Sequence, residues 1–249
     1  MRKRDILAAL AVGLGLWQAL VWITGAPHFI LPSPLRVANA LIHSREVIAE
    51  NALVTLQEII AGLILGTLLG VATAIQLTLS KTAERLMLPI LVFTQAVPVF
   101  ALAPVLTLWF GYGMASKIVM TVLIIYFPVT SAFHDGLTRV DRGLLDQAKI
   151  MGARPLQTLL RIQVPHALPS LGTGLRLAAV YAPIGAVIGE WAGASKGLGY
   201  LMLLANGRAK IDLMFASLIV LACLTVLLHT AIGVLSRQLV AYSEGRRLR

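Results

Sequence analysis

The chain has 249 residues, of which 58% are hydrophobic and 13% are charged, where about 25% charged is usual for a soluble protein. So few charges cannot cover the surface of a soluble chain of this length, and the composition therefore indicates a membrane protein. The formal net charge is +10. Nucleic-acid binding would need the basic residues as a patch on a soluble domain, and their position between apolar runs argues against that class.

A helix that crosses a membrane needs about 20 predominantly apolar residues. In chain order, the candidate stretches are 6–23, 52–79, 86–110, 118–133, 171–191 and 213–235. We therefore expect an all-α, polytopic membrane protein with six transmembrane helices. These helices are expected to form a single domain that covers residues 1–249.

The distribution of Lys and Arg predicts the orientation, because these residues gather on the cytoplasmic side of a membrane. With both termini in the cytoplasm, 15 of the 21 basic residues lie in inner segments and 6 in outer segments. The opposite orientation would invert this bias. We therefore expect both termini to be cytoplasmic.

Prolines and glycines recur inside the predicted spans. Pro98 and Pro104 remove hydrogen bonds from the third span, and lipid does not replace them. We therefore expect the third to fifth spans to pack on one another or to line a path. Gly62, Gly66 and Gly70 repeat every four residues. This spacing fits a close-packing face between helices, or the ordinary glycine enrichment of membrane helices.

A few polar side chains within the spans are candidates for a substrate path. Glu58 and Glu190 could each face a cavity, or could lie near the lipid headgroups, where an acid costs less. Gln95 and Ser131 could contact a solute, or could bridge helices. We predict no catalytic residue and no metal site.

The longest predicted cytoplasmic segment, residues 134–170, carries a short amphipathic pattern. Residues 146–151 fit the end of one helix, Gly152 its C-terminal break and Pro155 the first turn of the next. Apolar residues then follow at helical spacing, at Leu156, Leu159, Leu160 and Val164. Pro165 and Pro169 are expected to stop this helix after about two turns. Its apolar face could lie in the lipid interface or in a groove on another protein, and the pattern leaves both open.

The stretch DQAKIMGA at 146–153, with IQVP at 162–165, resembles the EAA loop of ATP-binding-cassette (ABC) importer permeases. Asp146 stands for the Glu of that motif and Gln147 for its first Ala, while Gly152 and Ile162 keep their spacing of nine intervening residues. The resemblance implies a type I ABC importer permease fold, with a coupling loop at about 135–170. The residues that it implies for contact with the ATPase are Asp146, Ala148, Gly152, Ala153, Leu156, Leu159, Leu160, Ile162 and Pro165.

The resemblance extends beyond the loop. The stretches LPSP at 31–34, AVPVFALAPVLTLWFGYG at 96–113 and GEWAGASKGLGYLM at 189–202 are similar to permeases that import taurine, alkanesulfonates, nitrate or thiamine-precursor pyrimidines. The resemblance implies that the protein lies in a bacterial-type inner membrane, transports by alternating access and has three kinds of partner. These are cytosolic ABC ATPase subunits, a second permease subunit, identical or different, and an extracytoplasmic substrate-binding protein.

The chain has no Gly-x-x-x-x-Gly-Lys-Ser/Thr phosphate loop. We therefore expect no cofactor in this chain, with ATP bound by the partner ATPase. The alternatives are a secondary transporter driven by an ion gradient and an intramembrane enzyme. The first favours mid-span acids and inverted repeats; here such acids are scarce and the two halves show no repeat. The second favours motifs such as His-Glu-x-x-His, which the sequence does not contain.

Overall fold

The computed structural model describes residues 3–247. Arg2 and Arg249, which were counted among the basic residues of the inner segments, lie outside the described residues. Within this range the chain consists of helices and their connections, without a strand, which confirms the all-α class. The helices are α1 (Lys3–Thr24), α2 (Pro34–His43), α3 (Arg45–Leu79), α4 (Lys81–Ala96), α5 (Val99–Phe110), α6 (Met114–Thr138), α7 (Arg142–Ile150), α8 (Pro155–Thr158), the π-helical η1 (Leu159–Gln163), α9 (Val164–Gly193), α10 (Leu198–Gly207) and α11 (Ile211–Arg247).

Four of these helices are long and apolar enough to cross a membrane. They are α3, α6, α11 and the continuous helix Pro155–Gly193, which contains α9. The first predicted span lies in α1, whose apolar part, Ala8–Thr24, is shorter.

The third predicted span, which its prolines were expected to interrupt, is broken into two helices. Its residues form α4 and α5, which meet at an angle of 100°. Pro98 causes the break, because it lacks an N–H and forces the residue before it out of the helical region. Val97 has ψ 122° accordingly.

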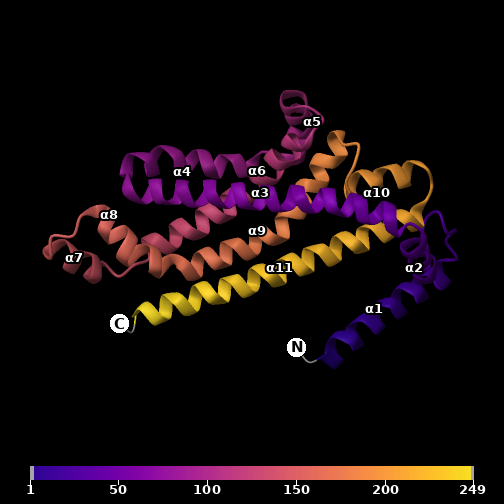
Figure 1. Cartoon of the computed structure of the whole chain (residues 1–249), viewed down its shortest axis with the longest axis horizontal. Coiled ribbons are helices and arrows are strands. Elements are labelled where there is room, and N and C mark those ends of the chain that lie inside the picture. Colours follow the sequence, from indigo (N-terminus) through magenta and orange to yellow (C-terminus); the bar gives the residue numbers. More distant parts are fainter. Residues whose placement is uncertain (1–2, 248–249) are drawn as a thin grey trace.

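The centre of the protein is the pair α6 and α9, with α3 and α11 alongside (Figure 1). Ala178, Ala182 and Ala186 recur every four residues on α9 and are fully buried against Ile125 and Val129 of α6. Small side chains at this spacing let two helices approach closely, which is how membrane helices gain packing energy without a hydrophobic driving force.

The glycines of α3 form a packing face against α6. A Cβ atom at Gly62 would lie 2.4 Å from Thr121, and one at Gly66 would lie 2.6 Å from Ile125. Contacts this short leave no room for a side chain. The close-packing interpretation of the Gly62, Gly66 and Gly70 repeat is therefore confirmed.

Gly185 of α9 also packs on α6, at Thr121, and gives a test of helix packing in the bundle. A Cβ atom there would lie 2.7 Å from the Cα atom of Thr121, and backbone cannot rotate away. We expect Gly185→Ala to cost about 1–3 kcal/mol of stability through overpacking. The matched control is Gly233→Ala on α11, where nothing lies within 4 Å. Thermal unfolding of the purified protein measures both, and an equal midpoint for the two variants would contradict tight α6–α9 packing.

The two ends of the bundle are built differently (Figure 1). We call the end that carries α7 and α8 the loop end, and the end that carries α2 and α10 the opposite end. At the opposite end, α2 is anchored by Val37, which packs with Leu198 and Leu201 of α10 and with Ala216 of α11. The C-terminal part of α11 reaches toward the loop end.

Candidate functional site

The loop between α6 and α9 is held by two local hydrogen-bonded turns. Gly152 ends α7 with φ +75°, and the N–H of Ala153 donates to the carbonyl of Ala148 at 2.9 Å. This is a Schellman C-cap, which needs a residue that tolerates a left-handed backbone. The N–H of Arg154 then donates to Gln157 Oε1 at 3.0 Å, which caps the turn that begins at Pro155. The breaks predicted at Gly152 and Pro155 are confirmed.

Large apolar side chains project from this loop into the surroundings. Ile150 is 86% exposed and Met151 is 85% exposed. We define the loop patch as the exposed apolar residues on the two sides of Gly152: Leu144, Ile150, Met151, Leu156 and Leu160. Exposed apolar residues grouped in this way mark an interaction surface with protein or membrane. The sequence pattern predicted the leucines as the contact residues. It did not predict Ile150 and Met151, because they lie before Gly152, outside the segment with helical periodicity.

Leu159 does not belong to this patch. It is fully buried in a cluster with Ala74 of α3, Phe133 and Leu137 of α6, and Ala167 of α9. The expected face of Leu156, Leu159 and Leu160 is therefore wrong at its middle member. The apolar residues have the expected helical spacing, but the η1 turn packs against α3 and α6, so its first residue, Leu159, joins the protein's own core.

The expectation that Pro165 and Pro169 stop this helix is wrong. The helix continues from Pro155 to Gly193. A π-helical turn at Leu159–Gln163 precedes Pro165, and such a turn lets a proline enter without its missing N–H breaking the helix. Ile162 and Pro165 are half-buried within this helix. Gln163 donates its side-chain N–H to the carbonyl of Leu137 at 3.1 Å, which ties the π turn to the end of α6.

The other predicted coupling residues lie around the turn. Asp146 is exposed on α7, and Ala148 is buried beneath it. Gly152 is exposed and Ala153 is half-buried. The structure thus brings Asp146, Gly152, Leu156 and Leu160 to one accessible loop.

Glu58 and Glu190 lie together inside the opposite half of the bundle. Glu58 is 2% exposed and Glu190 is 1% exposed, and each side chain contacts the other. They are therefore not acids exposed to the headgroups. Lys117 of α6 is buried near both acids, which compensates part of their charge.

Glu190 binds the start of α10. Its Oε2 accepts hydrogen bonds from the N–H groups of Gly199 at 2.5 Å and Tyr200 at 3.2 Å. These are unpaired donors of the first helical turn, where a negative charge is also favoured by the helix dipole. Its Oε1 accepts from the hydroxyl of Thr55 at 2.6 Å, and that hydroxyl accepts from the N–H of Leu198 at 2.7 Å.

Two further contacts complete this network. The N–H of Gly197 donates to Asn51 Oδ1 at 2.7 Å. Lys117 donates to the carbonyls of Gly113 at 2.8 Å and Gly193 at 2.9 Å, which joins α6 to the end of α9. The segment 197–200 is thereby fixed to α3 and α9 by side chains from distant parts of the chain.

The remaining predicted path residues lie elsewhere. Ser131 lines a cavity between α3, α4 and α6. Gln95 is exposed near the end of α4, beside the break at Pro98. Glu58, Glu190, Ser131 and Gln95 therefore do not form one site. In the part of the chain that the structure describes, no group of His, Cys, Asp and Glu is placed to hold a metal ion.

These features define a class: a multi-pass helical membrane protein with a helical interaction loop between two of its spans. Residues 62–241 match the family described as binding-protein-dependent transport system inner membrane component. The chain belongs to this family, and it is the membrane-spanning permease subunit of an ABC importer. The secondary-transporter and enzyme alternatives are not favoured.

Curated relatives match along nearly the whole chain. A probable ABC transporter permease protein of Haemophilus influenzae is 50% identical and covers 93% of this chain and 96% of its own. The formylaminopyrimidine transport permease protein ThiX of Halalkalibacterium halodurans is 37% identical, with 92% of each chain covered. The taurine transport system permease protein TauC of Escherichia coli is 28% identical, with 95% of this chain and 88% of its own covered.

A solved structure shows the same fold. It is that of the MetNI methionine ABC transporter in an inward-facing conformation. The TM-score is 0.69 at 19% identity, and the match covers 79% of this chain and 97% of the other. This likeness confirms the type I permease fold.

Proposed function

We propose that the loop patch docks this permease on a cytosolic ABC ATPase, which binds and hydrolyses the ATP. The observation that carries the proposal is the exposure of Ile150 and Met151 beside the buried anchor Leu159. A docking surface must be accessible, and a surface that transmits force must be fixed to the bundle. Leu159 and Gln163 supply that connection to α3 and α6. The predicted orientation puts this end of the bundle in the cytoplasm, as such a partner requires.

The rest of the assembly follows from the family. A second permease subunit, identical or different, completes the path, because the long spans of one chain are too few to enclose one. The exposed apolar residues on α4 and α5, such as Phe93, Phe100 and Leu108, offer surface for this subunit. An extracytoplasmic binding protein delivers the solute at the opposite end. Transport then proceeds as a rigid-body switch between two states.

The solute is proposed to be a small nitrogen heterocycle, of the kind found in thiamine precursors. The support is the order of identity among relatives. The formylaminopyrimidine permease is 37% identical and the riboflavin permease RibX of Chloroflexus aurantiacus is 35% identical. The putative aliphatic sulfonates permease SsuC of Bacillus subtilis is 29% identical. A sulfonate, taurine or nitrate is the second candidate.

Reconstitution tests the proposal directly. The permease is placed in proteoliposomes with its ATPase, and the binding protein is added outside with radiolabelled hydroxymethyl-aminopyrimidine or with taurine. We expect ATP-dependent uptake of the pyrimidine, at least about tenfold faster than uptake of taurine, since a site built to hydrogen-bond one solute rejects others strongly. Uptake of taurine without uptake of the pyrimidine would refute the solute class. Uptake that persists without the ATPase would refute the coupling.

A further inference from the structure

A cavity of about 150 Å³ lies between α3, α4 and α6, in the half of the bundle near the loop end. Five of its lining residues are apolar: Leu77, Leu88, Leu91, Val92 and Phe127. The others are polar and come from one face of α6: Thr130, Ser131, His134 and Asp135. An apolar chamber with a few polar groups on one wall is the usual form of a small-molecule site.

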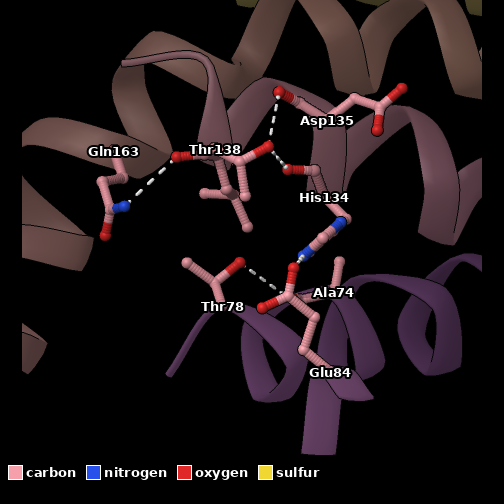
Figure 2. Close-up of polar contacts among 8 residues, drawn as sticks. Ala74, Thr78, Glu84, His134, Asp135, Thr138 and Gln163 are labelled. Carbon is pink, nitrogen blue, oxygen red and sulfur yellow. Dashed lines mark hydrogen bonds and ion pairs between the residues drawn. The ribbon is translucent and has the colours of Figure 1, made fainter. Parts of the chain in front are cut away.

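His134 is the feature that points to a ligand. The residue is 6% exposed, and its buried Nε2 atom has no hydrogen-bond partner. The Oε1 atom of Glu84 on α4 lies 3.9 Å from this nitrogen, beyond hydrogen-bonding distance. Figure 2 shows the imidazole turned toward this carboxylate across the gap between α6 and α4. A buried polar atom left without a partner costs about 1–3 kcal/mol, so a ligand atom that pairs with it is favoured.

The size and charge of the cavity select the kind of ligand. An apolar protein cavity of about 150 Å³ accepts benzene, so the volume fits one six-membered ring. None of the lining residues is Lys or Arg, and Asp135 brings a negative charge to the rim. A sulfonate or nitrate would therefore lose its hydration without gaining a cationic partner. An uncharged ring with nitrogen donors and acceptors meets the apolar wall with its face and the polar wall with its edge.

We propose that this cavity binds a small, uncharged nitrogen heterocycle of single-ring size, with His134 and Ser131 as its polar contacts. The inference rests on the proposed function for the identity of the ring, which is the solute that the importer carries. It adds to that function a binding site within the permease itself. The surrounding contacts connect the site to the loop, because α6 ends directly beyond it and Leu137 accepts the hydrogen bond from Gln163.

Direct binding to the permease–ATPase complex in lipid nanodiscs tests the site, with the binding protein left out. The probe is radiolabelled hydroxymethyl-aminopyrimidine, and taurine serves as the charged competitor. We expect saturable binding that taurine does not displace. His134→Leu removes the polar contact and Ser131→Phe fills the cavity, and each should weaken binding at least about tenfold, the change expected when a hydrogen bond in a dry site is lost.

Two further variants keep the result interpretable. His134→Gln retains a neutral hydrogen-bonding group and should bind more tightly than His134→Leu. His229→Leu makes the same substitution at an exposed position of α11 and should bind as the unaltered complex does. Thermal unfolding of each complex identifies any variant that fails to fold. If His134→Leu fails to fold, the binding measured for His134→Gln tests the role of His134.

The outcomes separate this site from the proposed function. Uptake of the pyrimidine by the full importer without saturable binding to the permease complex overturns the site and leaves the function. Binding that neither cavity variant changes, or that taurine displaces, also overturns it. Binding that the variants weaken, in an importer that does not transport the pyrimidine, supports the site and refutes the solute class.

Discussion

Glu190→Ala is expected to release α10 from the bundle and to abolish transport. The substitution removes the acceptor of three hydrogen bonds, from Thr55, Gly199 and Tyr200, and leaves buried donors without partners. At about 1–3 kcal/mol for each unsatisfied group, the loss is a large fraction of the stability of a typical domain. Hydrogen exchange at residues 197–200 and the thermal midpoint of the purified protein measure it, and a fall of more than about 5 °C is expected.

Matched variants identify the cause of that loss. Glu50→Ala removes an exposed acid from the same end of α3 and should change neither measurement. Thr55→Val keeps the shape of the side chain and removes the hydroxyl that joins Glu190 to Leu198. Because both residues act in one network, the effects of Thr55→Val and Glu190→Gln should not add. Additive effects, or unchanged exchange at 197–200 in Glu190→Ala, would show that the carboxylate does not hold α10.

Replacing Ile150 and Met151 together by aspartate is expected to separate the permease from its ATPase. Both side chains are exposed in the isolated chain, so the free permease should fold normally. Burial of two such side chains is worth about 1.5–3 kcal/mol each, and two carboxylates in their place would be desolvated without partners. Co-purification of the ATPase and ATP-driven uptake should both fall at least about tenfold.

The control for this double variant adds negative charge away from the loop. Asn39→Asp places an acid at an exposed position of α2, at the opposite end, with almost no change of shape. It should leave the ATPase bound. Leu159→Asp is unsuited as a test of docking, because Leu159 is part of the core and its replacement would destabilise the bundle itself. Full uptake by the Ile150 and Met151 double variant would mean that the ATPase docks elsewhere.

The sequence alone determined the class of the protein and the place of its loop. Runs of apolar residues can be counted without knowing where they pack, because each helix satisfies its own backbone hydrogen bonds in lipid. The turns at Gly152 and Pro155 were predictable for the same reason: one needs a left-handed backbone and the other tolerates a missing N–H, and both requirements are local. Gly62, Gly66 and Gly70 indicated a helix contact, although not its partner.

Only the tertiary structure decided which residues of the loop are accessible, and where the buried polar groups meet. A helical face is apolar whether it packs on its own bundle or on a partner, so the pattern grouped Leu159 with Leu156 and Leu160. The fold separates them, because the end of α6 covers one side of the helix. Likewise Glu58, Lys117 and Glu190 come from α3, α6 and α9, and His134 of α6 meets Glu84 of α4. Such pairings depend on how the helices rotate and slide on packing, which is set by the sum of many side-chain contacts and not by any one stretch of the chain.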